Sequence, residues 1–196
     1  LGYSFKFVWA PLVDRLPLPF ITRALGRRRA WMLVSQLAIM GAISLMSSVD
    51  PKASVESLTI MAYGAVLLGF ASATQDIVID AYRIESADKD MQSMLSATYV
   101  TGYRIGMLVA SAGGLFIAGY LGSTKESYSY DAWSGTYLMM AAVMLIGVAT
   151  TLIINEPKSV REETEFTTID YVQFFLLFLS IVVAFILTFI ATADLA

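Results

Sequence analysis

The chain has 196 residues, of which 57% are hydrophobic and only 15% are charged, and its mean hydropathy is +0.68. Soluble globular domains are about 45–50% apolar and about 25% charged, so this composition argues against a soluble domain and against a disordered chain. The net charge of −3 offers phosphates no basic surface, which excludes a nucleic-acid binder. The chain has no cysteine and no histidine, so thiol chemistry is excluded and proton transfer near neutral pH falls to carboxylates.

Length and hydropathy predict that the chain crosses a membrane several times. About 20 mostly apolar residues span the hydrocarbon core as a helix, and unpaired backbone groups exclude open strands there. The run 1–12 is too short to span and is interpreted as the cytoplasmic end of a truncated helix, so we expect a piece of a longer membrane protein. The predicted fold class is all-α, a polytopic membrane helical bundle. Its full spans are predicted at residues 30–49, 58–82, 94–121, 133–154 and 171–193.

The loop charges predict the orientation of these spans. Segments 13–29, 83–93 and 155–170 hold five, two and two basic residues, whereas the opposite loops hold only Lys52 and Lys125. Because Lys and Arg accumulate in cytoplasmic loops, we expect these three segments to be cytoplasmic. At the other edge we expect an aromatic belt of Tyr120, Tyr128, Tyr130, Trp133 and Tyr137.

Three charged side chains fall inside predicted helices, namely Lys6, Asp76 and Arg104. At about 1.5 Å rise per residue they lie roughly 12, 10 and 15 Å inside the cytoplasmic edge, in one layer. Such residues usually face a cavity or a partner. The alternative is structural ion pairs, or side chains of Lys6 and Asp80 that merely reach the interface. For Asp76 with Arg104 we favour a functional pair, since burying charges costs desolvation without an assured gain in stability.

Other candidate residues surround this layer. Asp80 lies near the cytoplasmic interface and shares a helix face with Asp76 and Arg83 through the spacing i, i+4, i+7. Four further side chains have types that stack on or hydrogen-bond a sugar or a peptide, although plain packing is the alternative. They are Trp9, Gln75, Tyr99 and Tyr103.

The segment Asp14-Arg15, followed by Gly26-Arg27-Arg28-Arg29, resembles the loop signature of the major facilitator superfamily. In that signature an Asp and basic residues at helix ends form a cytoplasmic gating cluster. The resemblance implies a gating role for Asp14, Arg15, Gly26, Arg27 and Arg28, and we assign Arg83 to the same role. In this chain the two parts of the signature are separated by residues 16–25, unlike the compact version.

Three further runs resemble AmpG-type muropeptide permeases: residues 5–15, 73–82 and 102–107, each centred on an intramembrane charge. This resemblance covers about residues 1–157 and implies helices two to six of a twelve-helix carrier, without its first helix and its C-terminal half. We therefore expect a transporter half at 1–154, a cytoplasmic linker at 155–170, and a seventh or inserted helix at 171–193.

The resemblance implies proton-coupled import of anhydromuropeptides into the cytoplasm across a bacterial inner membrane. No cofactor is expected apart from the proton gradient, and no metal site. Asp76 and Asp80 would couple transport to protons, and Lys6 and Arg104 would bind substrate carboxylates or form ion pairs. A carrier of acetyl-CoA or another organic anion is the alternative function. A remote alternative is an intramembrane aspartyl enzyme, but Asp76 and Asp80 lie on one predicted helix and no Gly-x-Gly-Asp motif occurs.

Overall fold

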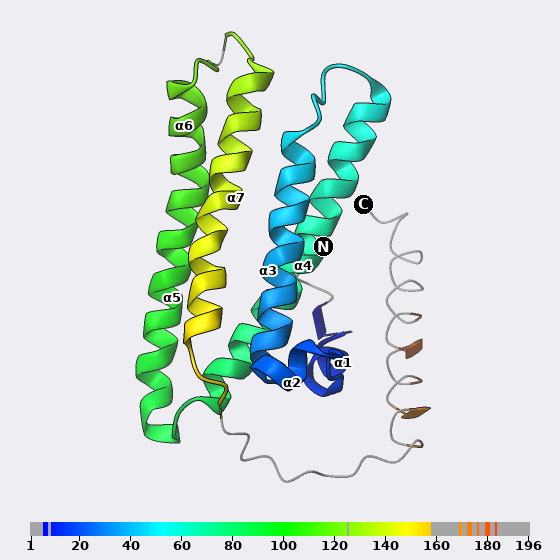
Figure 1. Ribbon diagram of the computed structural model, residues 1–196, viewed down its shortest axis with the longest axis vertical. Helices are drawn as coiled ribbons and strands as arrows, with labels where there is room; N and C mark the ends of the chain where they lie inside the picture. The colour runs from blue at the N-terminus through cyan, green and yellow to red at the C-terminus, as the bar shows by residue number, and fades with distance from the viewer. Residues whose placement is uncertain are drawn as a thin grey trace, which may run out of the picture. The chain divides into compact units, whose positions relative to one another are not determined.

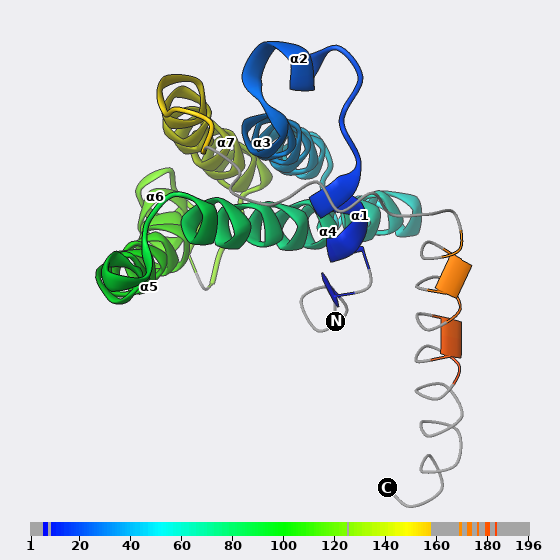
Figure 2. The ribbon, with the colours of Figure 1, turned by 90° about the horizontal axis from the view of Figure 1, so that it is seen from below.

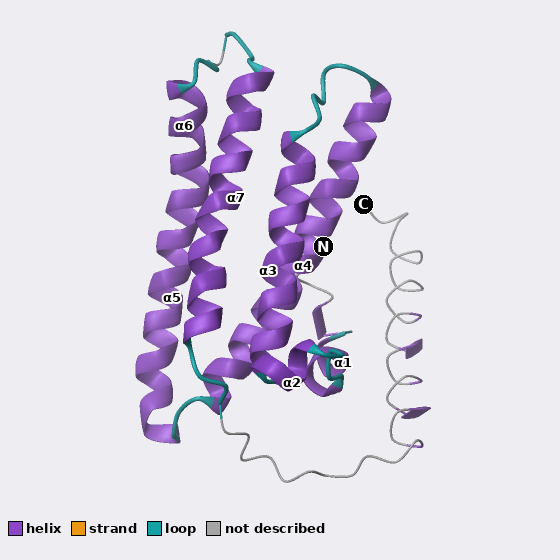
Figure 3. Cartoon of the chain, in the orientation of Figure 1, coloured by secondary structure: helices purple, strands orange, loops and turns teal. Residues whose placement is uncertain are grey.

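The computed structural model describes residues 6–7, 9–124 and 126–157, and the single positions 169, 172, 173, 176, 179, 180 and 183. The chain divides into two units, Leu1–Lys158 and Ser159–Ala196, and the first holds the elements described below (Figures 1 and 3). Every element that the structure describes in this unit is helical. In order they are α1 (Ala10–Arg15), α2 (Ile21–Leu25), α3 (Arg27–Ser47), α4 (Val55–Glu85), the 3₁₀ turn Lys89–Met91, α5 (Gln92–Leu108), the π turn Val109–Gly113, α6 (Gly114–Tyr120) and α7 (Tyr130–Ile153).

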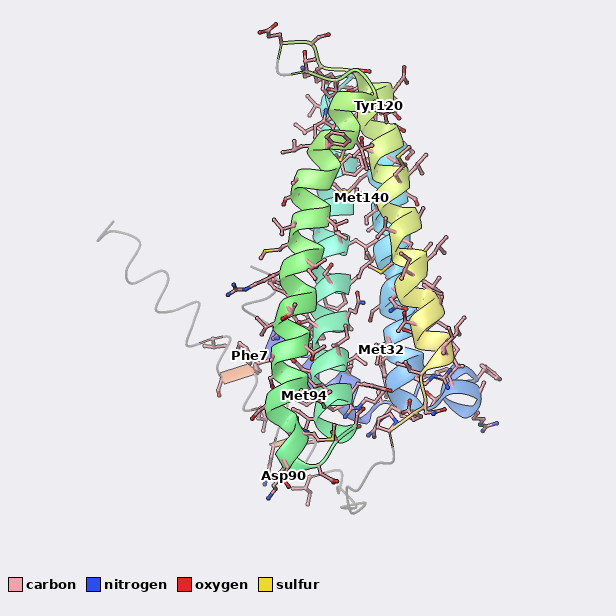
Figure 4. All side chains as sticks on the ribbon, turned by 90° about the vertical axis from the view of Figure 1, so that its left-hand side faces the viewer. Phe7, Met32, Asp90, Met94, Tyr120 and Met140 are labelled. Atoms are coloured by element: carbon pink, nitrogen blue, oxygen red, sulfur yellow. The ribbon has the colours of Figure 1, made fainter. Side chains whose placement is uncertain are left out.

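Four of the predicted spans are confirmed as helices long and apolar enough to cross a membrane, and with them the all-α membrane fold. These are Arg27–Ser47, Val55–Glu85, Lys89–Tyr120 and Tyr130–Ile153. Figure 4 shows the third from Asp90 and Met94 at one end to Tyr120 at the other. The predicted span 171–193 and most of the linker 155–170 lie outside the described residues, so the predicted domain division stays a prediction.

The segment 13–29, expected as a loop, contains the end of α1 and all of α2. Pro11 stands at the start of α1, where its fixed φ suits the first helical turn. Leu16 ends the helix in extended conformation because the next residue, Pro17, disfavours helical geometry before it. Gly26 separates α2 from α3 with φ +89°, which a glycine adopts without strain. Helices as short as α1 and α2 are not predicted from apolar runs of membrane-spanning length.

Two serines set the starts of α4 and α7, a few residues before the apolar runs begin. The hydroxyl of Ser54 accepts a hydrogen bond from the Ser57 amide at 3.0 Å. The hydroxyl of Ser129 accepts one from the Ala132 amide at 3.3 Å. Serine is a preferred residue at this position because it satisfies an amide that has no partner within the helix.

The helix α3 lies at the centre of the unit and packs against both α4 and α7, while α6 packs on α7 (Figure 2). Fully buried alanines, such as Ala30 and Ala42 of α3 and Ala73 of α4, let the backbones approach closely. The core between α1, α3 and α4 centres on Val13, Met32, Ile77 and Val78. By contrast, α5 has no buried residue.

A buried polar pair joins α3 to α7. The Gln36 amide donates to the Thr151 hydroxyl at 2.9 Å, and this hydroxyl lies 3.1 Å from the Gln36 carbonyl oxygen. Both side chains are almost completely buried. Each therefore satisfies the polar atoms of the other where neither water nor lipid could do so.

We expect Gln36→Leu and Thr151→Val to couple by about 0.6 to 2 kcal/mol in a double-mutant cycle, because each removes the partner of the other. The measurement is unfolding of the purified protein in detergent. Thr150→Val is the control, since Thr150 is exposed and bonds only within α7, to Ile146. Additive effects of Gln36→Leu and Thr151→Val would contradict the interhelical bond.

Candidate functional site

Three charged residues of α4 point to one side of the helix, as their spacing predicts. Asp76, Asp80 and Arg83 all contact side chains from α5 or from the N-terminal segment. The helix reaches Glu85, so these polar groups lie in its cytoplasmic-side third under the predicted topology. One continuous helix therefore positions all three.

Asp76 is held by a cation and by a phenol. Its Oδ2 lies 2.5 Å from Lys6 Nζ, and its Oδ1 accepts a 2.6 Å hydrogen bond from the Tyr99 hydroxyl of α5. The side chains of Lys6 and Asp76 are 34% and 18% exposed, so neither is fully removed from the surface. Both carboxylate oxygens of Asp76 therefore have a partner, one from the N-terminal segment and one from α5.

The same contacts extend toward the end of α4 and close into a ring, which we name the Asp76 network (Lys6, Asp76, Asp80, Arg83 and Tyr99). Lys6 Nζ also lies 3.7 Å from Asp80, and Arg83 lies 3.5 Å from Asp80. The Arg83 guanidinium is 5.7 Å from the centre of the Tyr99 ring. The network therefore holds two cations and two carboxylates that balance in charge.

A cavity of about 590 Å³ opens beside this network, between α3, α4, α5 and α7. Asp76 and Tyr99 stand at its wall, so the carboxylate of the ion pair borders the space. Gln75 and Tyr103, two of the residues predicted to contact substrate, also line it, and Tyr103 is 56% exposed. The rest of its lining is apolar or small: Ile39, Ser72, Ile79, Gly102, Gly106, Met107, Ala110 and Met144.

Two predicted site residues lie elsewhere. Arg104 is exposed and forms no ion pair within the described part of the chain, so the partner of Asp76 is Lys6 rather than the expected Arg104. The reason is helical geometry, since Arg104 lies five residues after Tyr99 and thus on another face of α5. The indole of Trp9 donates to Thr74 at 3.1 Å and its ring lies 4.8 Å from Phe70, so Trp9 packs α1 on α4.

A second polar cluster surrounds Arg28 at the start of α3, and we name it the Arg28 cluster. The guanidinium is only 2% exposed and bridges Asp14 of α1, at 2.6 Å, to Glu85 of α4, at 2.5 Å. Its Nε and Nη2 both donate to Glu85, in the bidentate geometry that suits arginine. The predicted association of Asp14 with the arginines is thus found at Arg28, which ties three helices together.

Glu156, just after α7, joins the Arg28 cluster from the other side. Its carboxylate accepts hydrogen bonds from the amides of Arg28 (2.8 Å) and Arg29 (3.1 Å), at the start of α3. Arg29 in turn donates to the last carbonyls of α7, those of Thr151 and Leu152. The free amides at the start of α3 and the free carbonyls at the end of α7 thereby gain hydrogen-bond partners. A Cβ on Gly26 would meet the Glu156 side chain, which explains a glycine there besides its positive φ.

Glu85 and Glu156 are the residues that the sequence prediction missed. Glu85 follows Arg83 at the end of α4, and Glu156 stands in an acidic segment, so both read as ordinary loop charges. The run of three arginines at 27–29 was the signal that could have found them. If one of these arginines is buried, it requires carboxylates from other segments of the chain. Arg27 forms no ion pair among the described residues, and the side chain of Arg15 lies outside them.

Comparison with known proteins identifies relatives that match most of the chain. A family model described as Major Facilitator Superfamily matches residues 2–195. A Rickettsia felis protein named "Putative transporter AmpG 4" is 36% identical over 169 residues, which are 86% of this chain and 38% of the relative. The anhydromuropeptide permease of Escherichia coli (strain K12) is 38% identical over 156 residues, which are 80% of this chain and 28% of the permease. No solved structure matches the chain significantly.

We expect Lys6→Gln and Asp76→Asn to couple by about 1 to 3 kcal/mol in detergent unfolding, because either change alone removes the shortest ion pair of a partly buried charge. Arg104→Gln is the matched control, and its effect should add to that of Asp76→Asn. Coupling of Asp76 to Arg104 and not to Lys6 would overturn this pairing.

Glu85→Gln should lower the stability of the folded protein by about 3 kcal/mol, because it leaves the buried Arg28 with half of its counter-charge. The exposed Asp90, close to Glu85 in sequence, provides the control: Asp90→Asn should change stability by about 0.5 kcal/mol or less. Thermal unfolding in detergent measures both variants. Equal effects of the two would show that Glu85 is an ordinary surface charge.

Proposed function

Because the chain belongs to the Major Facilitator Superfamily, a family of transporters rather than enzymes, we propose that it forms part of a proton-coupled anhydromuropeptide importer. The chain spans 38% of the length of the first Rickettsia relatives it matches. The remaining segments of the carrier, including its second half, would complete the transport path. Under this proposal the carrier lies in the bacterial inner membrane, with segments 13–29, 83–93 and 155–170 in the cytoplasm.

The observation that supports coupling is the position of Asp76, ion-paired and at the wall of a 590 Å³ cavity. A carboxylate there can exchange a proton with the cavity. A proton on Asp76 cancels its charge, so the contact with Lys6 loses its Coulomb energy. Lys6 is then left with Asp80 at 3.7 Å as its nearest described carboxylate. Asp80 therefore serves as the second proton-coupling residue, because it receives the cation that Asp76 releases.

Tyr99 transmits this change to α5. Its hydroxyl joins α5 to Asp76, while Arg83 donates to Ser96 of α5 at 2.5 Å. Since α5 buries no residue of its own, polar bonds supply much of its attachment to α4. A protonated Asp76 is a weaker acceptor for the Tyr99 hydroxyl, which loosens one of these bonds. Alternating access then follows as rocking of one group of helices against another around a central site.

The cavity wall offers the chemistry that a sugar–peptide needs. Gln75 and Tyr103 supply donors and acceptors for hydroxyls and amides, and the aromatic ring of Tyr103 provides a stacking surface. The carboxylates of a peptide stem would be attracted by Lys6 or by the exposed Arg104. Trp9 is assigned to packing in place of substrate contact, because it bonds to Thr74 and lies against Phe70.

The Arg28 cluster serves as the cytoplasmic gate of this proposal. It links α1, α3 and α4 through one buried guanidinium, and α7 through Glu156. Such a charged junction has one low-energy arrangement, so it resists gradual deformation and instead breaks as a unit. Gly26 allows the close approach of Glu156. Arg15, Arg27 and Arg83 are assigned to the same gate by their sequence positions, at the end of α1, the start of α3 and the last turn of α4.

A carrier of another organic anion is the second candidate, since the exposed Arg104 offers a cation without specifying the anion. Competition separates the two functions. Uptake of labelled anhydromuropeptide should be blocked by unlabelled anhydromuropeptide and not by acetyl-CoA. Stronger inhibition by acetyl-CoA than by unlabelled anhydromuropeptide would instead indicate a carrier of another organic anion.

Asp76→Asn, in the full carrier reconstituted in proteoliposomes, should abolish uptake driven by an imposed pH gradient and preserve exchange of substrate across the membrane. The amide keeps the shape of the side chain but cannot release a proton. The exposed Asp131 provides the control, and Asp131→Asn should leave both activities intact. Normal pH-driven uptake by Asp76→Asn would refute the coupling role.

A further inference from the structure

A second, smaller cavity lies at the end of the bundle opposite the Arg28 cluster. It has a volume of about 200 Å³ and lies between the end of α3, the start of α4 and the start of α7. Figure 1 shows the α3–α4 and α6–α7 connections together at this end. The lining is aromatic and apolar, with one serine: Met46, Val49, Pro51, Met61, Tyr128, Tyr130, Trp133, Ser134 and Tyr137.

The walls of this cavity are fixed in place by polar contacts. The Tyr130 hydroxyl donates to the carbonyl of Ser47 at 2.9 Å, which joins α7 to the end of α3. The Tyr128 hydroxyl donates to Asp50 Oδ1 at 3.1 Å. Burial and this bond raise the pKa of Tyr128, which lies outside the spanning helices, so the phenol keeps its proton. Aromatic rings with polar tips are typical of the membrane–water interface.

Two opposite charges contact Tyr128 of the cavity lining and do not pair with each other. Lys52 Nζ lies 4.2 Å over the Tyr128 ring and forms no ion pair with any described carboxylate. Asp50 accepts bonds from Tyr128 and from the Lys52 amide through Oδ1, while its Oδ2 has no hydrogen-bond partner among the described residues. Pro51, between them, belongs to the cavity lining. One free cation and one free carboxylate oxygen thus flank an apolar pocket.

We propose that this cavity binds a membrane phospholipid with a phosphoethanolamine headgroup. Charge complementarity identifies the occupant: the phosphate meets Lys52, the primary ammonium donates to Asp50, and part of one acyl chain fills the apolar pocket. A choline headgroup has no N–H to donate, and a glycerol headgroup brings no cation for Asp50. A water-soluble zwitterion would leave the aromatic lining unfilled. The site is distinct from the 590 Å³ cavity and shares no lining residue with it.

Native mass spectrometry of the delipidated full carrier, with phosphatidylethanolamine, phosphatidylcholine or phosphatidylglycerol of identical chains added back, tests the proposal. We expect phosphatidylethanolamine to bind most tightly. Asp50→Asn and Lys52→Gln should each weaken that binding about fivefold, the effect of one charge near a lipid headgroup. The matched controls Asp88→Asn and Lys89→Gln change the same charges at exposed positions at the other end of the bundle and should leave it unchanged.

Three results would overturn the proposal. Equal binding of the three lipids would show that the pocket takes any acyl chain. Equal effects of the Asp50 and Lys52 variants and of their controls would show that these two residues take no part. Displacement of the lipid by an equal concentration of glycerophosphoethanolamine, which has the headgroup without chains, would assign the site to a soluble ligand.

Discussion

A buried guanidinium determines how this bundle is assembled at the end where α1, α3 and α4 meet. Arg28 is almost inaccessible, and a charge removed from water in this way is tolerated only with counter-charges at short distance. Asp14 and Glu85 provide them, and each comes from a different helix. The positions of α1 and α4 relative to α3 therefore follow from one electrostatic requirement. Apolar packing alone would specify these positions weakly, because lipid competes with it on equal terms.

The helix α4 connects this junction to the cavity. Asp76 at the cavity wall and Glu85 in the Arg28 cluster lie on the same 31-residue helix without a break between them. Nine residues of α-helix cover about 14 Å, so a shift of α4 acts on both sites. In the proposed mechanism this rigid connection joins proton binding at one site to opening at the other. No chain of small side-chain movements is needed between them.

The membrane fold was predictable because apolar runs of spanning length have few alternatives in lipid. The face shared by Asp76, Asp80 and Arg83 was also predictable, since helical spacing is local. The partners were not: Lys6 rather than Arg104 meets Asp76, and this depends on how α5 is rotated, which spacing within one helix does not define. Glu85 and Glu156 were missed for a similar reason. They contact Arg28 in the folded chain but lie 57 and 128 positions away from it in the sequence. The short helix α2 was not predicted, because the sequence was searched for apolar runs long enough to cross a membrane.

The π turn at Val109–Gly113 has a consequence for the small residues of its span. Gly102, Gly106 and Ala110 line the large cavity, while Gly114 and Ala118 are buried in the following helix, α6, which packs on α7. In an unbroken α-helix, residues spaced by four drift around the axis by about 40° per step. The wider π turn winds an extra residue into one turn and cancels part of this drift. It thus acts as a register correction: the small residues before it line a cavity that Met144 of α7 also lines, and the small residues after it belong to the helix that packs on α7.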